Sequence, residues 1–199
     1  MQTPHAITSE AYGVSVEPLT VEHAGELFEL CGEDDFKYYT SQPTPFNHDG
    51  WKAFITARNS LTLNGLPGFG HLLRYHGQVA GMSTVFDYDA GNRKLEIGYT
   101  MIGKPFRGTP VNPASKLQLM GASFEQWNIL RVQVKGDAKN ERSMRAMTRM
   151  GFHDEGVLRK FMILANGYER DNHYFSVIAE EWPMVKARLV EMCEARALR

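Results

Sequence analysis

The sequence predicts an α+β fold in which a mixed, mostly antiparallel sheet carries helices on both faces. Three short apolar segments, Gly70 to His76, Gln78 to Asp87 and Arg93 to Met101, are separated by tight-turn residues, a pattern typical of antiparallel hairpins. Between residues 112 and 178 helical and strand patterns alternate, which indicates a β-α-β arrangement beside those hairpins. A sheet with both kinds of connection is usually covered on both faces, so we expect a three-layer domain.

The N-terminal third predicts one strand and two helices. Residues 1–13 are expected to form a loose end, and Val14 to Glu17 a strand. Thr20 is a typical N-cap for a helix that follows it. The apolar face of that helix comprises Ala24, Leu27, Phe28 and Cys31. The remaining segments are an irregular stretch at 32–50, a helix from about Trp51 to Asn59 and a Gly/Pro loop at 61–70.

The second half predicts three helices and three strands. Helix 112–127 has apolar residues at intervals of three and four, which indicates one buried stripe. The helix from Asn140 to Met150 is followed by Gly151, a typical residue just beyond a helix end. The other segments are strands at 130–135, 152–164 and 168–178 and a last helix from Glu181 to about Ala197.

Length and composition restrict the class of protein. With 199 residues, of which 43% are apolar and 23% charged, the chain is expected to form a single globular domain, 1–199, with 181–199 as a helical extension. A net charge of −1 gives no field that would attract nucleic acid or an anionic membrane. The polar start, the lack of a spanning apolar run and two widely spaced cysteines favour a cytoplasmic protein without a metal site.

A window without acidic residues indicates an anion-binding loop. Between Ile97 and Phe124 there is no Asp or Glu, whereas Arg107 and Lys116 are basic. The loop 107–112 leads into a helix start, where Asn112 is the expected N-cap. Free backbone N–H groups at such a start bind phosphate or pyrophosphate. The alternative is an ordinary helix start whose charge bias arose by chance.

Several motifs, in their order and spacing, resemble the GNAT (Gcn5-related) N-acetyltransferase superfamily, and most closely its ribosomal-protein N-terminal acetyltransferase branch. The resemblance covers about Ser15 to Trp182, and no single motif would be specific. The motifs are Leu95-Glu96-Ile97-Gly98-Tyr99, Phe106-Arg107-Gly108-Thr109, Asn140-Glu141-Arg142-Ser143, Met150-Gly151-Phe152, Glu155-Gly156-Val157-Leu158-Arg159 and Trp182.

The resemblance implies that the loop binds acetyl-CoA. It implies strands that separate near Ile97 to Tyr99, leaving N–H groups for the thioester. The family's small loop positions hold Pro110 and Asn112 here, and Pro113 follows, so two N–H donors are missing. The expected cofactor-binding residues are Ile97, Gly98, Tyr99, Arg107, Gly108, Thr109, Val111, Asn112, Lys116 and Asn140.

Two residues are candidates for the chemistry. Ser143, on the apolar side of its helix, could protonate the leaving thiolate, or it could merely bond its own helix backbone. Glu96, alternating with apolar neighbours in a strand, could accept the amine proton through water, or it could pair with a base such as Arg74 or Arg93.

The acceptor side is expected in the acidic and aromatic segment that follows residue 32. Acids beside aromatics could hold a cationic amine, although a solvated loop with its aromatics in the core is the alternative. The expected substrate-binding residues are Asp35, Phe36, Tyr39 and Trp51, with His173 on the last strand.

These expectations combine into an acetyl-CoA-dependent N-acetyltransferase that acts on a primary amine, such as a protein N-terminus, by direct attack. The alternatives are an acetyltransferase of small amines or aminoglycosides and a CoA-binding module without turnover. The last helix has Val185, Leu189, Met192 and Cys193 at intervals of three and four, an apolar face on which a homodimer could form.

Overall fold

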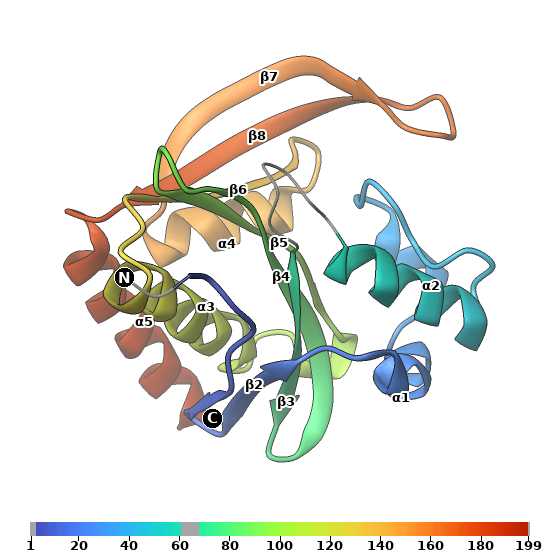
Figure 1. The fold of residues 1–199 in the computed structure, drawn as a ribbon, viewed down its shortest axis with the longest axis horizontal. Helices are drawn as coiled ribbons and strands as arrows, with labels where there is room; N and C mark the ends of the chain where they lie inside the picture. Colours follow the sequence, from blue (N-terminus) through green and yellow to red (C-terminus); the bar gives the residue numbers. More distant parts are fainter. Residues whose placement is uncertain (1–2, 61–67, 199) are drawn as a thin grey trace.

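A computed structural model describes residues 3–60 and 68–198. Its centre is an eight-stranded sheet in the order β1-β2-β3-β4-β5-β6-β8-β7, in which β5 and β6 are parallel and the other neighbours antiparallel (Figure 1). The predicted α+β class is therefore confirmed. The strands are β1 Ser9–Ala11, β2 Val14–Pro18, β3 Phe69–Tyr75, β4 Gln78–Asp89, β5 Lys94–Ile102, β6 Arg131–Asp137, β7 His153–Ile163 and β8 Glu169–Ile178.

Helices cover both faces of this sheet. Figure 1 shows α1 and α2 on one side and α3, α4 and α5 on the other. Two separate apolar clusters fill the two layers, one around Trp51 and Leu72 and one around Leu119 and Val132. The α-helices are α1 Ala24–Leu30, α2 His48–Asn59, α3 Val111–Gly121, α4 Glu141–Met150 and α5 Trp182–Ala197, with short helical turns at η1 Val21–His23, η2 Glu33–Phe36, η3 Lys104–Phe106 and η4 Ala122–Gln126.

The N-terminal segment differs from its prediction. Residues 9–11 form β1, which pairs with β2, so the expected loose end at 1–13 is wrong for this part. Ile7 is buried, and its backbone N–H donates to Nε2 of His71 at 3.1 Å. These contacts add an edge strand that the polar sequence did not indicate.

Helix boundaries follow the caps more closely than the apolar periodicity. α2 begins at His48, three residues earlier than expected, because the Asn47 side chain accepts a hydrogen bond from Gly50 N at 3.0 Å. The end of α4 is as predicted, with Gly151 at φ 88°, a conformation that favours glycine. The predicted loop at 61–70 lies mostly outside the described residues.

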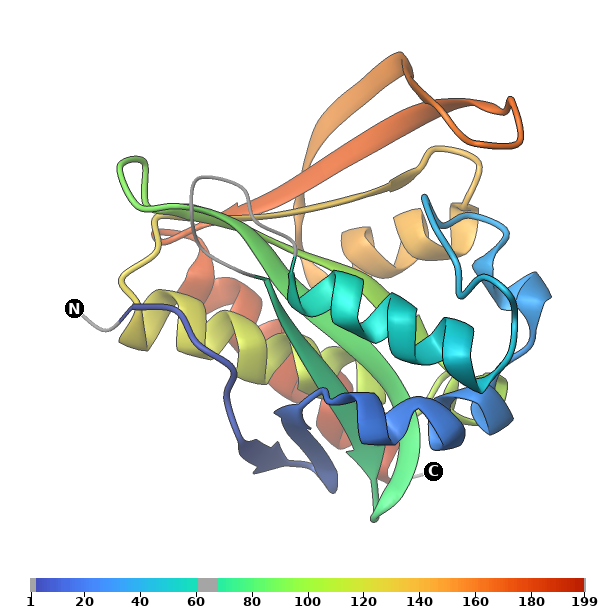
Figure 2. The same cartoon turned by 45° about the vertical axis from the view of Figure 1, so that its right-hand side comes forward.

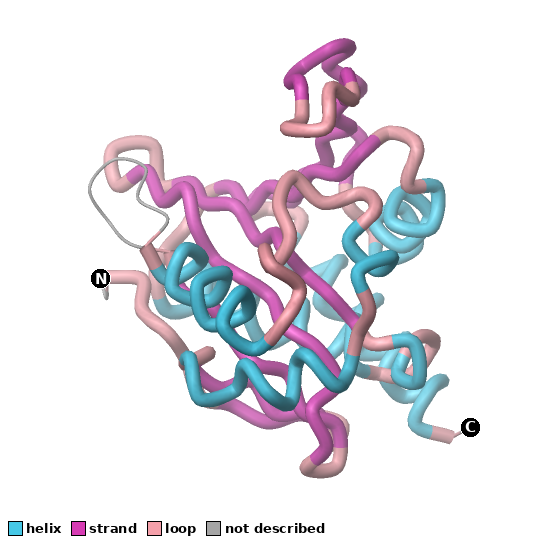
Figure 3. Tube along the Cα trace, turned by 90° about the vertical axis from the view of Figure 1, so that its right-hand side faces the viewer, coloured by secondary structure: helices cyan, strands magenta, loops and turns pink. Residues whose placement is uncertain are grey.

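The last helix is part of the core. Val185, Leu189 and Cys193 are fully or almost fully buried, and α5 packs beside α3 (Figure 2). The apolar face that suggested a homodimer is therefore used largely within the chain. β7 and β8 instead extend as a hairpin beyond the rest of the sheet (Figure 3). No helix in the described ranges is long and apolar enough to cross a membrane.

Candidate active site

The parallel strands β5 and β6 separate part-way along the sheet. Their pairing ends at Glu96 and Gln133, although both strands continue beyond these residues. On the other side of β5, Tyr99 and Thr100 stand opposite the single residue Ser83, which makes a bulge. Tyr99 has φ 48°, a left-handed conformation that is uncommon for a residue other than glycine. The strand separation implied by the resemblance is thus present, with strained backbone at its rim.

A cavity of about 320 Å³ opens where the strands separate, and we call it the splay cavity. Residues from β5, β6, α3, α4 and the segment after η2 line it. These include residues 96–100 and Tyr38, Tyr39, Lys116, Lys135, Asp137, Asn140, Ser143, Met147 and Arg170. The cavity therefore brings together ionisable groups from segments far apart in the chain.

Glu96 lies in the wall of the splay cavity, and its side chain is only 2% exposed. Its Oε2 accepts hydrogen bonds from Lys135 Nζ at 2.7 Å and from Gln133 Nε2 at 3.0 Å. Burial raises the pKa of Glu96 above its ordinary value, and the attraction of Lys135 opposes this only in part. A cross-strand ion pair is thus present, but its base is Lys135, not Arg74 or Arg93.

The first turn of α4 also faces the splay cavity. Asn140 is the N-cap, as predicted, and its Oδ1 accepts a hydrogen bond from Ser143 N at 3.2 Å. Ser143 is half-buried and lines the splay cavity together with Asn140. The cap fixes the backbone that carries Ser143, while Met147 and Met150 anchor the helix in the core.

A second cavity of about 510 Å³, the arginine cavity, adjoins the first. The predicted loop contributes Gly108 and Asn112 to the second cavity. The two cavities share Tyr39, Thr100, Asn140, Ser143 and Met147. Five arginines line the arginine cavity, and guanidinium groups are suited to binding phosphate. They are Arg107, Arg142, Arg145, Arg149 and Arg196.

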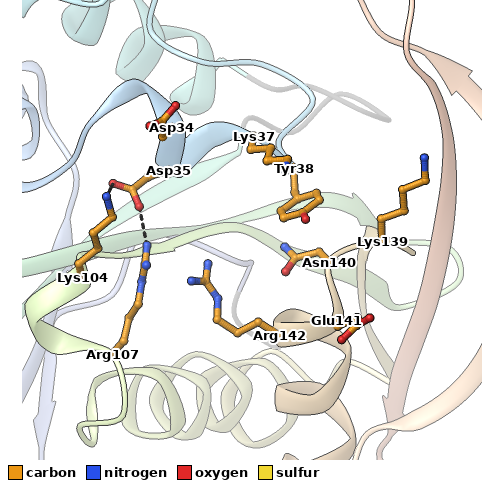
Figure 4. Close-up of a pocket in the computed structure, with 10 residues that line it drawn as sticks. All are labelled: Asp34, Asp35, Lys37, Tyr38, Lys104, Arg107, Lys139, Asn140, Glu141 and Arg142. Carbon is orange, nitrogen blue, oxygen red and sulfur yellow. Dashed lines mark hydrogen bonds and ion pairs between the residues drawn. The ribbon is translucent and has the colours of Figure 1, made fainter.

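One of these arginines is held by an acid from the other side of the sheet. Arg107 Nη2 lies 2.6 Å from Asp35 Oδ1, and Lys104 Nζ lies 3.9 Å from Asp35 Oδ2 (Figure 4). Burial acts to raise the pKa of Asp35, but hydrogen bonds from Arg107 and from Gly32 N outweigh it, so the pKa lies below its ordinary value. The Asp35 carboxylate, expected on the acceptor side, is therefore paired with the predicted cofactor loop.

The start of α3 differs from the prediction. The helix begins at Val111, so Asn112 lies inside its first turn and is not the N-cap. The reason is local: Thr109 Oγ1 accepts a hydrogen bond from Val111 N at 3.3 Å, and Pro110 supplies the preceding φ. Ala114 N is already bound to Pro110 O at 2.9 Å, so fewer free donors remain than the sequence suggested.

Lys116 also lies elsewhere than expected. It is 1% exposed, and it lines the splay cavity. It does not line the arginine cavity, where Arg107 lies. Its Nζ donates to Thr100 Oγ1 at 2.7 Å. Burial lowers the pKa of Lys116 to about 7.

Of the expected acceptor residues, Tyr39 is the one that lies at both cavities. Its hydroxyl donates to Thr100 O at 2.6 Å. Phe36 and Trp51 are buried in the α1–α2 core, so their side chains cannot contact a substrate. His173 lines neither cavity: it faces Asp154 on β7 at 2.7 Å, because alternation along β8 turns it away from Arg170.

Three charged residues of the splay cavity were not found from the sequence. Lys135 and Asp137 alternate on the face of β6 beside Glu96, and Arg170 on β8 donates to Tyr38 O at 3.0 Å. Asp137 is 1% exposed, and its Oδ2 has no hydrogen-bond partner among the described residues. Alternation on β6 was visible in the sequence, but its pairing with β5 and β8 was not. The described residues contain no group of three or more His, Cys, Asp or Glu side chains that could hold a metal ion.

The fold as a whole matches solved structures of acetyltransferases. A provisionally assigned acetyltransferase from T. thermophilus has 33% identity and a TM-score of 0.87, with 96% of this chain and 98% of that chain covered. RimJ of Mycobacterium smegmatis, solved in complex with CoA-disulfide, shares the fold at 18% identity, with a TM-score of 0.77 and coverage of 92% and 90%.

The chain belongs to the GNAT acetyltransferase family, because the profile described as "Acetyltransferase (GNAT) domain" matches residues 14–153. YdaF of Bacillus subtilis (strain 168), provisionally named a ribosomal N-acetyltransferase, is 31% identical over 170 residues, which cover 84% of this chain and 90% of YdaF. The protein is therefore a GNAT N-acetyltransferase, as the motifs implied.

Proposed function

We propose that this N-acetyltransferase uses acetyl-CoA to acetylate a primary amine of a protein N-terminus by direct attack. The observation that carries the proposal is the junction of the two cavities at Asn140 and Ser143. The arginine cavity offers guanidinium groups for the phosphates of CoA. In the splay cavity, Glu96 lies beside the part of β5 that is not paired with β6. A thioester at the junction would lie between donor and acceptor.

In this mechanism the protein holds the two reactants together and manages two protons. The amine nitrogen attacks the thioester carbon, and Glu96 accepts the amine proton through water. The raised pKa of Glu96 suits a base that works near neutral pH. As the carbon–sulfur bond breaks, Ser143 donates a proton to the thiolate. Backbone N–H groups near Ile97 to Tyr99 would polarise the carbonyl.

The choice of a protein N-terminus rests on relatives. YdaF is named for ribosomal substrates, and a third cavity of about 410 Å³, which lies between η2 and the start of α4 and is lined by Asp34, Tyr38 and Arg142 among others, would admit part of a peptide (Figure 4). A small amine or an aminoglycoside is the alternative acceptor within the same reaction. A CoA-binding module without turnover is the alternative outside it, and it is favoured by the two prolines that remove N–H donors at the loop, Pro110 and Pro113.

The test combines isotope-labelled acetyl-CoA with a peptide library, small amines and aminoglycosides, read by intact mass and by release of free thiol. A matched library with blocked N-termini and no lysine is the control. We expect label on free N-termini only, with one thiol released per acetyl group. Label on small amines alone would contradict the acceptor class, and CoA binding without thiol release would contradict catalysis.

A further inference from the structure

Lys116 is a buried cation without an acidic partner among the described residues. It is 1% exposed, and in this part of the chain its ammonium has one hydrogen-bond acceptor, Thr100 Oγ1 at 2.7 Å, and no carboxylate within ion-pair distance. A lysine removed from water normally requires a counter-charge or several acceptors. At least one further N–H of Lys116, in either protonation state, therefore lacks an acceptor in residues 3–60 and 68–198.

The position of this side chain is fixed by β5. The bulge at Tyr99 places Thr100 opposite Ser83, and the Ser83 and Thr100 hydroxyl oxygens are 2.8 Å apart. The Thr100 carbonyl is bound separately by the Tyr39 hydroxyl. The Thr100 hydroxyl is thus held from one side by Ser83 and receives Lys116 from the other. This arrangement directs the lysine at the part of β5 that has no partner strand.

A substrate bound in the splay cavity can supply the hydrogen-bond acceptor that Lys116 lacks. Lys116 lines it together with Gly98, Thr100 and Ser143, the residues beside which the proposed function puts the thioester. Neither acid of the cavity forms an ion pair with Lys116: Glu96 binds Lys135, and Asp137, whose Oδ1 accepts hydrogen bonds from Lys139 N and the Tyr168 hydroxyl, lies beyond ion-pair distance of Lys116 although its Oδ2 has no partner among the described residues. Among the described residues, no acid therefore holds the free N–H of Lys116.

We propose that Lys116 donates a hydrogen bond to the thioester carbonyl oxygen of the bound acyl donor and stabilises the oxyanion formed on attack. The inference rests on the proposed function and adds a catalytic residue to it. When the amine nitrogen bonds to the carbonyl carbon, the π electrons move to oxygen, beside Lys116. When the oxyanion collapses, the carbon–sulfur bond breaks, Ser143 protonates the thiolate and the amine proton leaves through Glu96. Lys116 begins and ends the cycle unchanged.

Lys116→Met tests this role, because methionine has a similar length and no N–H. Loss of an oxyanion donor lowers kcat by about 10²–10³-fold in other enzymes, and we expect a loss of that order with CoA affinity changed less than about threefold. Thermal stability should stay level or rise, since a poorly paired buried ammonium is removed. Lys52→Met, at an exposed site on α2, is the control and should match the wild type.

Several outcomes would overturn the inference. One is a Lys116→Met protein with wild-type kcat, and another is parallel loss of kcat and stability, which would indicate a structural lysine. A mass gain of one acetyl group on Lys116 itself would make it an acceptor instead. If the wild type itself shows no turnover, the proposed function is overturned, and the role of Lys116 in it is overturned as well. If Lys116→Met does not fold, Thr100→Val removes the acceptor that orients Nζ, and it should lower kcat about tenfold with unchanged CoA affinity; unchanged kcat would refute the role.

Discussion

Replacing Asp35 with asparagine should destabilise the protein measurably at neutral pH. The Asp35 side chain is 4% exposed and lies 2.6 Å from Arg107, whose side chain is 30% exposed. Breaking a buried ion pair costs about 3–5 kcal/mol, whereas exposed pairs contribute about 0–1 kcal/mol. Because Arg107 is partly solvated and asparagine can still accept a hydrogen bond, we expect a loss of about 1–2 kcal/mol. For a chain of this length that corresponds to a Tm lower by roughly 2–8 °C.

The assay is thermal unfolding of the wild type, Asp35→Asn and Asp34→Asn between pH 7 and pH 3. Asp34 is the exposed neighbour on η2 and serves as the control, with an expected change in Tm near zero. The pKa of Asp35 is depressed in the fold, so its stabilisation is complete above the ordinary carboxyl range and is lost as pH falls through the depressed value. The difference between wild type and Asp35→Asn should therefore shrink in acid. Equal Tm values at pH 7, or a difference that grows in acid, would refute the reasoning.

Three further predictions concern the two cavities. Ser143→Ala should lower kcat by roughly 10²-fold with CoA affinity and Tm nearly unchanged; a fully active variant would leave Ser143 with only a packing role. Arg107→Glu should weaken CoA binding measured by calorimetry, less so at high salt, whereas Arg159→Glu on the exposed hairpin should not; equal affinities would remove Arg107 from the site. Because the folded pKa of Lys116 is about 7 and an unfolded lysine titrates near ~10.4, stability contributed by this group should rise from about pH 7 to pH 10. Lys116→Met should remove that rise relative to wild type, and parallel curves would show that the lysine is not buried in solution.

The sequence predicted the order of elements well because each signal was local. Turn residues separated β3, β4 and β5, and the cap at Asn140 with Gly151 delimited α4. β1 was missed because its residues are polar and its stability comes from pairing with β2, which no local pattern reveals.

The candidate site was predicted less completely, because its charges pair across the fold. The absence of acidic residues around Arg107 in the sequence suggested that its guanidinium is free to bind an anion. In the structure Asp35, from a turn far away in sequence, forms an ion pair with that guanidinium. Because Lys116 follows the loop closely in sequence, it was expected to bind the same anion as Arg107. In the structure α3 directs its side chain into the splay cavity instead. The alternation along β5 indicated that Glu96 lies on the opposite side from its apolar neighbours, while its partner Lys135 depended on the parallel pairing of β5 with β6. Residue spacing indicates the side of a helix or strand on which a side chain lies, but it does not identify the residue that the side chain contacts.

In the proposed mechanism the acetyl group is transferred in the splay cavity with Glu96 as the proton acceptor. The most direct test is the pH dependence of kcat/KM for the wild type, Glu96→Gln and the control Glu155→Gln, whose carboxylate lies outside both cavities. The wild type and the control should lose activity in acid, with a midpoint above the ordinary range of a glutamate, because burial raises the pKa of Glu96. Glu96→Gln should lose the break that belongs to Glu96, and its rate should instead rise only at high pH, where the amine deprotonates unaided. A Glu96→Gln profile with the wild-type shape would contradict the account.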